Sequence, residues 1–95
     1  MGVGTIPPTA EAEGVDKARY VAAAGLVHGD GATVVFRIEV LDSGEIGRIE
    51  VDVSSRDPRI DEAAMAYLRA WHWRSGTHNG EPRSMWIRLG VRFDA

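Results

Sequence analysis

The chain has 95 residues, of which 44% are hydrophobic, so it can form one small domain with a modest core. Its formal net charge is −3 and its 11 Lys and Arg residues are scattered, which gives no reason to expect a nucleic-acid partner, because phosphate binding needs clustered basic side chains. Cysteine is absent, which excludes disulfides and thiolate metal sites, and we expect no direct membrane insertion because no apolar run approaches the roughly 20 residues of a membrane span and no signal peptide is evident.

The first third of the chain predicts an arm and a short helix. Residues 1–14 mix Gly, Pro and small side chains without periodicity, which predicts a flexible N-terminal arm ahead of a folded domain at residues 15–95. Asp16–Leu26 is rich in Ala and carries apolar side chains on neighbouring turns, so we expect a short helix with Asp16 as its N-cap. The two glycines in His28–Gly31 come without a Walker-type Lys, and this segment is interpreted as a turn.

Two alternating segments then predict a β-hairpin. Thr33–Leu41 alternates apolar and polar side chains, and Asp42–Ser43–Gly44 is a short connection in which Gly takes the left-handed conformation. In the return strand Ile49, Val51 and Val53 alternate with polar residues. The polar side chains of both strands share the solvent face, where cross-strand ion pairs would each add about 0.2–1 kcal/mol.

The second helix has the clearest start signal in the chain. Asp57 is a good N-cap, and Pro58 at the first helical position loses no hydrogen bond. Asp61 and Glu62 suit the positive end of the helix dipole. One apolar stripe should pack against a sheet, and its members are Ile60, Ala64, Tyr67, Leu68 and Trp71.

A last alternating strand, Met85–Phe93, completes the predicted fold. Because the helix recrosses the sheet, an all-antiparallel arrangement requires the strand order 2-1-3. We therefore predict an α+β domain of α-β-β-α-β order, with a three-stranded antiparallel sheet, a short N-terminal helix and one main helix on one face. The last strand is then an edge, and edges are aggregation hazards unless they are charged, blocked or used for binding.

Three segments of the chain together resemble the C-terminal domain of the TonB energy-transducer family. They are the hairpin VVFRIEVLDSGEIGRIEVDVSS, the helix DPRIDEAAMAYLRAWHW and the final IRLGVRF after NGEP. The residues that match the family pattern in order and spacing are Ser54, Ser55, Pro58, Asp61, Glu62, Ala63, Ala64, Trp71 and Trp73. The chain departs from the pattern at Val15–Ala18, where a Tyr-Pro pair is usual, at His72 and at Ser75.

The resemblance implies a periplasmic domain that couples an inner-membrane motor to outer-membrane transport. In that family a short N-terminal segment of a TonB-dependent outer-membrane transporter pairs with the last strand, which is β-augmentation in physical terms. The expected contact residues are Ser84, Met85, Trp86, Ile87, Arg88 and Leu89. The alternative is a stand-alone envelope protein that forms a homodimer by pairing or exchanging edge strands.

No other constellation of residues predicts chemistry. His28, His72 and His78 lie in different segments without ligand spacing, so no metal and no other cofactor is expected. Ser54–Ser55 lacks a nucleophile elbow and a placed base, so we predict that the chain is not an enzyme. Trp71 is expected in the core, whereas Trp73 and Trp86 could serve either local packing or an interface.

Overall fold

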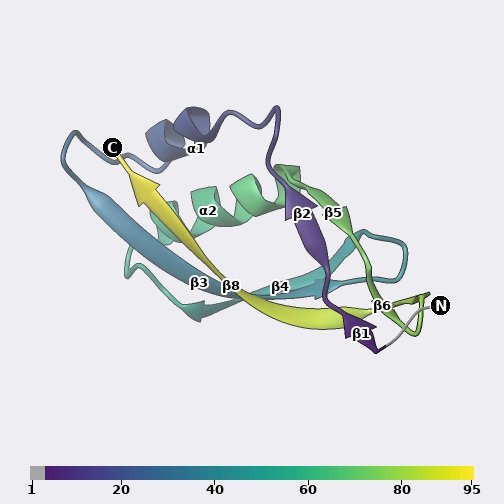
Figure 1. The fold of residues 1–95 in the computed structure, drawn as a ribbon. Coiled ribbons are helices and arrows are strands. Elements are labelled where there is room, and N and C mark those ends of the chain that lie inside the picture. Colours follow the sequence, from purple (N-terminus) through teal and green to yellow (C-terminus); the bar gives the residue numbers. More distant parts are fainter. Residues whose placement is uncertain (1–3) are drawn as a thin grey trace.

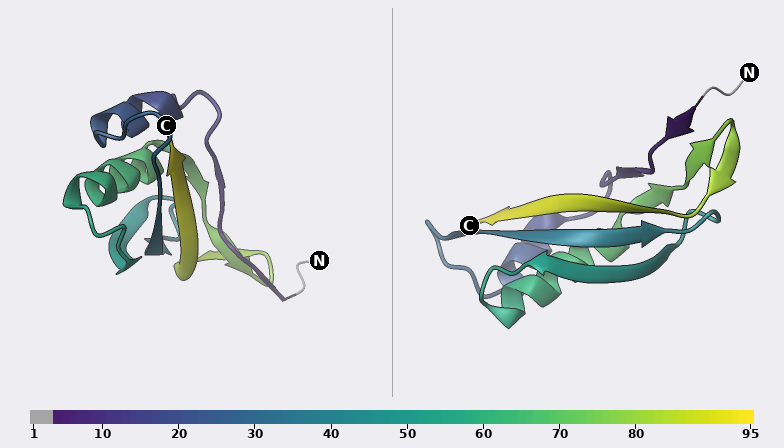
Figure 2. Two further views of the ribbon diagram at one scale, coloured as in Figure 1. Left: turned by 90° about the vertical axis from the view of Figure 1, so that its left-hand side faces the viewer. Right: turned by 90° about the horizontal axis from the view of Figure 1, so that it is seen from below.

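The computed structural model describes residues 4–95, and residues 1–3 of the predicted arm lie outside the described part. Its centre is a three-stranded antiparallel sheet of β3 (Gly31–Val40), β4 (Ile46–Val53) and β8 (Met85–Asp94), in the order β4-β3-β8. This is the order 2-1-3 expected for the three long strands. Helices α1 (Lys17–Ala23) and α2 (Pro58–Ala70) lie on one face of the sheet, and the view from below shows the other face open (Figures 1 and 2). The α+β class, the antiparallel pairing and the two helices are thus confirmed.

Five short strands form two further sheets, so the predicted fold was incomplete. They are β1 (Thr5–Ile6), β2 (Thr9–Glu11), β5 (His72–Arg74), β6 (Gly76–His78) and β7 (Glu81–Arg83). One sheet has the order β1-β6-β7 and the other pairs β2 with β5. The N-terminal segment that we expected to be a flexible arm therefore supplies two paired strands in its described part. These small sheets lie at the end of the central sheet where β8 begins (Figure 1).

The core lies between the two helices and the helical face of the central sheet. The fully buried large side chains are Phe36, Phe93, Ile38, Leu68, Val34 and Val40, as the alternation in β3 and the stripe on α2 predicted. The return strand β4 behaves differently from the prediction, because Val51 and Val53 are 40% and 49% exposed. The register of β3 with β4 shifts between Val35 and Phe36, so Val53 turns to the open face opposite Val35. Val51 stays opposite the buried Phe36 on the helical face, at the edge of the sheet.

An aromatic cluster joins α1, α2 and the end of β8. The ring of Tyr67 lies 5.5 Å from Tyr20, 5.3 Å from Trp71 and 5.8 Å from Phe93, measured between centroids. Trp73 stacks on Trp71 at 5.8 Å, and its indole N–H donates to the carbonyl of Leu68 at 2.9 Å. Trp73 is therefore used in local packing, where it also satisfies a carbonyl at the end of α2.

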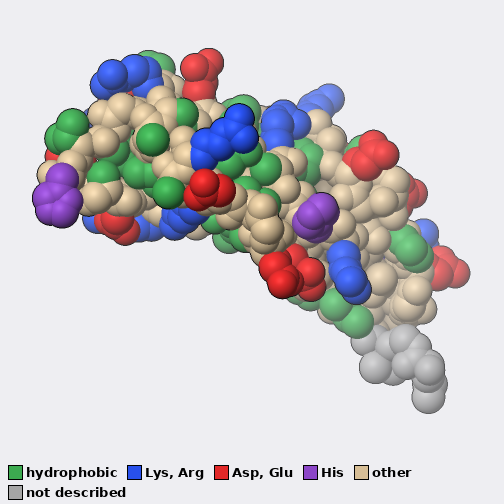
Figure 3. Space-filling model, turned by 90° about the horizontal axis from the view of Figure 1, so that it is seen from above, with side chains coloured by type: hydrophobic (Ala, Val, Ile, Leu, Met, Phe, Trp, Pro, Cys, Tyr) green, Lys and Arg blue, Asp and Glu red, His purple; other side chains and the backbone are tan. Residues whose placement is uncertain are grey.

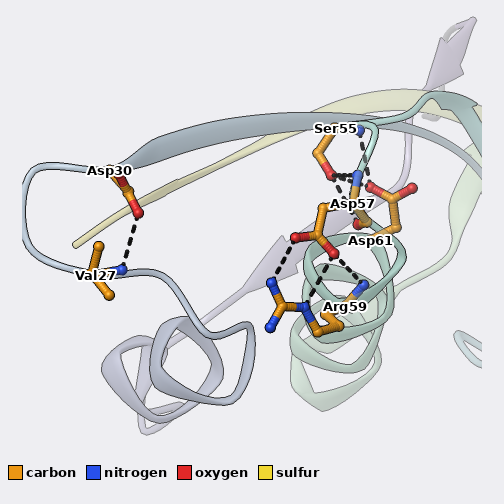
Figure 4. Close-up of polar contacts among 6 residues, drawn as sticks. All are labelled: Val27, Asp30, Ser55, Asp57, Arg59 and Asp61. Atoms are coloured by element: carbon orange, nitrogen blue, oxygen red, sulfur yellow. Dashed lines mark hydrogen bonds and ion pairs between the residues drawn. The ribbon is translucent and has the colours of Figure 1, made fainter.

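Hydrogen bonds at the start of α2 involve two carboxylates (Figure 4). Asp57 is the N-cap, as predicted, and accepts from the backbone N–H of Arg59 at 2.9 Å. The Arg59 side chain and then its backbone N–H stabilise the ionised carboxylate, so the pKa of Asp57 is lowered. Asp61 accepts from the backbone N–H of Ser55 at 2.9 Å, from the Ser55 hydroxyl at 2.6 Å and from the Ser54 hydroxyl.

Asp61 thus does more than complement the helix dipole, which was the role expected for it. Partial burial works to raise the pKa of Asp61, but the hydrogen bonds from Ser54 and Ser55 together outweigh it, and the net pKa is lowered. The serine pair and Asp61 tie the end of β4 to the first turn of α2. At the other helix, Asp16 is the N-cap as predicted and accepts from the N–H of Ala18 at 3.2 Å.

Candidate partner-binding edge

The last long strand, β8, lies at an edge of the central sheet. Within the described residues it pairs with β3 alone, in a continuous register from Gly31↔Asp94 to Val40↔Met85. Figure 2 shows this strand along one border of the sheet in the view from below. The predicted contact segment Ser84–Leu89 covers the residue before β8 and the first half of the strand.

Two backbone hydrogen bonds define which groups of β8 point outward. Ala95 N–H donates to the carbonyl of Asp30 at 2.9 Å, and Leu41 N–H donates to the carbonyl of Glu45 at 2.8 Å. In an antiparallel ladder the residues of one strand alternate between bonding to one neighbour and to the other. Both bonds fit one alternation along β3, in which even-numbered residues bond to β8 and odd-numbered residues bond to β4. On β8, the residues whose N–H and C=O point away from β3 are therefore Trp86, Arg88, Gly90 and Arg92.

The predicted contact residues thus divide into two sets. Met85, Ile87 and Leu89 are half-buried on the helical face and bond to β3, so they hold the strand in the sheet. Trp86 and Arg88 are exposed, lie on the open face and present their backbone to solvent. The hydroxyl of Ser84 accepts from the N–H of Asp42 at 3.1 Å, which attaches the start of β8 to the turn after β3.

The outward-facing set continues past the predicted segment. Gly90 and Arg92 are exposed and follow the same alternation, but the prediction stopped at Leu89. The alternation of Met85–Phe93 contained the signal needed to include them. The candidate site is therefore the outer edge of β8 from Trp86 to Arg92, which we call the β8 edge.

Charged side chains on the open face are paired across and along the sheet. Arg88 Nε lies 2.6 Å from Asp52 Oδ2 on β4, and Arg92 Nε lies 3.0 Å from Asp94 Oδ1. The guanidinium of Arg37 lies 5.3 Å from the centre of the Trp86 ring, a cation–π arrangement, and Trp86 is 41% exposed. These exposed pairs each contribute about 0–1 kcal/mol, so their main effect here is to orient side chains beside the edge.

The other candidate groups are placed apart from the β8 edge. Within residues 4–95, no three His, Cys, Asp or Glu side chains are arranged to hold a metal ion. None of the helices in the described part of the chain is long and apolar enough to span a bilayer. On the helical side, acidic and basic side chains are interspersed (Figure 3). The serine pair is engaged by Asp61 at the start of α2.

This geometry defines a small α+β domain with a helix-backed antiparallel sheet and a regular edge strand. Comparison with known proteins gives the family. The family model described as "Gram-negative bacterial TonB protein C-terminal" matches residues 19–95, and the chain belongs to this family of energy-transducing proteins. The resemblance inferred from the sequence is thereby confirmed.

Two curated relatives support the assignment. Each is a Protein TonB, from strains B100 and ATCC 33913 of Xanthomonas campestris pv. campestris, and is 32% identical to this chain over 60 residues. The aligned part is 63% of this chain and 27% of each relative, so the chain spans about a quarter of their length. No solved structure matches the chain significantly.

Proposed function

We propose that this chain is a periplasmic TonB-type domain that binds a short N-terminal segment of an outer-membrane transporter by strand addition to the β8 edge. The observation that carries the proposal is the alternation of outward-facing backbone groups from Trp86 to Arg92. Each of these residues offers one N–H and one C=O, and neither group has a backbone partner within the described chain. An extended peptide satisfies such groups with its own main chain, which supplies affinity, and its alternate side chains add specificity.

Strand addition also suits a role in energy coupling. A peptide that lies along β8 is loaded parallel to the strand axis when it is pulled, and its hydrogen bonds with the edge then share the force. Affinity in the micromolar range, on the order of −8 kcal/mol, is enough for a partner that must be released again. The uninterrupted pairing with β3 and the burial of Val91 and Phe93 anchor β8 to the rest of the domain.

The test is a pair of substitutions at Arg88, whose N–H points outward. Arg88→Pro removes this N–H but breaks no bond to β3, because proline is tolerated at an edge when its nitrogen faces solvent. Arg88→Ala is the matched control, since it removes the same side chain and its ion pair with Asp52 but keeps the N–H. Binding is measured by fluorescence anisotropy with a labelled peptide from the N-terminal segment of a TonB-dependent transporter of the same organism.

We expect Arg88→Ala to bind within about threefold of the unmodified protein, since an exposed ion pair contributes little. Arg88→Pro should bind at least about tenfold more weakly, because it removes a donor and distorts the edge, while its melting temperature stays close to that of Arg88→Ala. Normal binding by a folded Arg88→Pro protein would rule out strand addition at this edge. Sedimentation of the free protein tests the alternative, since a tight homodimer that buries β8 would leave no edge for the peptide.

A further inference from the structure

Asp52 occupies an irregular position on β4. The register of β3 with β4 passes from Val35↔Val53 to Phe36↔Val51, so Asp52 has no residue opposite it on β3. An extra residue of this kind is a β-bulge, and bulges can re-aim a side chain at a functional site. The bulge therefore helps to determine where the carboxylate of Asp52 points.

The carboxylate of Asp52 is directed across β3 toward the edge strand β8. Its Oδ2 lies 2.6 Å from Nε of Arg88, although the two residues belong to the strands that flank β3 on either side (Figure 2). The residue of β3 directly opposite Arg88 is Arg37, and like charges in such a pair repel each other. Arg37 has its own carboxylate on β4, Glu50, at 3.8 Å. The ion pair with Asp52 therefore holds the Arg88 side chain over the sheet and away from the outer side of β8.

The position of this guanidinium matters for any strand added to β8. Directly opposed residues of adjacent strands have Cβ atoms about 4.5–5.5 Å apart, so one side chain of the added strand would lie beside Arg88. Opposite charges in such a pair stabilise it, and like charges destabilise it. An acidic side chain beside Arg88 gains little here, because it has to compete with Asp52 for the guanidinium.

We propose that Asp52 is a positioning residue that sets the charge preference of the β8 edge without touching the partner. This inference rests on the proposed strand addition and concerns the partner side chain beside Arg88. With Asp52 in place, the charge of Arg88 is paired within the domain, and the edge does not select an acidic side chain at this position. Without Asp52, Arg88 is an unpaired cation that Arg37 repels toward the outer side of β8, where it attracts an acidic side chain.

The test compares peptides that carry Asp or Asn at one position. Each position of the labelled transporter peptide is replaced in turn by Asp and by Asn, and the ratio of the two affinities is measured by fluorescence anisotropy. The two side chains have nearly the same shape, so the ratio reports charge. For Asp52→Asn, the ratio at one position should shift about threefold in favour of Asp, relative to the unmodified protein, as expected for an exposed cross-strand ion pair. The shift should disappear in about 1 M salt, where the Debye length is about 3 Å.

Two controls separate the positioning of Arg88 from a general effect of charge. Glu50→Gln makes the same change in net charge on the same strand, but it frees Arg37, which lies one strand further from the partner, so the ratio should not shift. In an Arg88→Gln background, Asp52→Asn should also leave the ratio unchanged, because no guanidinium is left to position. An equal shift at every peptide position, or a shift that persists without Arg88, would overturn the inference.

These outcomes are distinct from those that test strand addition itself. If Arg88→Pro abolishes binding but Asp52→Asn gives the same ratios as the unmodified protein, strand addition stands and the role of Asp52 is wrong. If a folded Arg88→Pro protein binds the peptide normally, both proposals are wrong.

Discussion

Replacing Asp61 by Ala removes the carboxylate that ties the end of β4 to the first turn of α2. Three donors lose the Asp61 carboxylate, namely the Ser54 hydroxyl and the hydroxyl and backbone N–H of Ser55, and of these the Ser55 hydroxyl keeps a second acceptor in the carbonyl of Asp57 at 3.1 Å. A hydrogen bond to a charged group contributes about 1.5–3 kcal/mol when it is well shielded, but water can replace much of this at a half-exposed site. We therefore expect a total loss of about 2 kcal/mol, since the Ser55 amide is partly buried and its hydroxyl is at close range.

The loss is measured by urea unfolding at pH 7, followed by circular dichroism. For a domain of this size, a change of 2 kcal/mol corresponds to a melting temperature lower by roughly 8–16 °C. Glu62→Ala is the matched control, because Glu62 is the next residue of α2, is exposed and makes no side-chain hydrogen bond in the described structure. It should cost only a few tenths of a kcal/mol through the helix dipole. An Asp61→Ala protein as stable as Glu62→Ala would refute the proposed structural role of Asp61.

The pH dependence of this difference gives an independent check. The pKa of Asp61 is lowered from its ordinary value of 3.8 in the folded protein, so the stabilisation is fully present above that ordinary value. It is lost as the pH falls through the folded pKa, because protonation then removes the charge that accepts the hydrogen bonds. The stability difference between the unmodified protein and Asp61→Ala should be constant from pH 7 to pH 5 and should shrink below about pH 4.

Two further predictions concern the backbone. Arg56 has a φ of 74°, a left-handed conformation that costs a non-glycine residue about 1–2 kcal/mol. Arg56→Gly removes this cost but gives the unfolded chain more entropy, so the free energy of unfolding measured in urea should rise by about 0.5–1 kcal/mol. Arg56→Ala keeps the steric cost and should give no gain. Ala10→Pro should break the pairing of β2 with β5. The amides of residues 72–74 should then exchange faster with deuterium, while the exchange of the β3 amides stays unchanged. Unchanged exchange at residues 72–74 would contradict this pairing.

The long elements could be predicted because each contains its own local signal. Buried and exposed side chains alternate along β3 and β8, which have ten residues each, and every second side chain packs against the helices. Asp16 and Asp57 signalled the starts of both helices because each can satisfy free N–H groups of a first turn. The strand order then followed from chain connectivity.

The short strands could not be predicted from local pattern. Strands β1 and β2 contain two and three residues, which is too short to show an alternation of apolar and polar side chains, and they pair with segments more than sixty positions away. One local signal for them was present in the sequence. Asn79–Gly80 is a typical two-residue hairpin turn, and its φ angles of 50° and 83° join β6 to β7. The orientation of Val53 could not be predicted, because the register shift that turns it to the open face depends on the partner strand.

The two edges of the central sheet differ in a way that bears on where a partner strand would bind. Strand β4 pairs with β3 through two register shifts, and such irregularities bend an edge and make it a poor template for another strand. Strand β8 pairs with β3 without a shift over ten residues, so its outer groups keep an even spacing. A regular, exposed edge is an aggregation hazard that proteins usually block with charge or irregular backbone. On β8 both Arg88 and Arg92 are paired with acidic groups of the same chain, so the strand addition that we propose would meet no unpaired charge from these two residues.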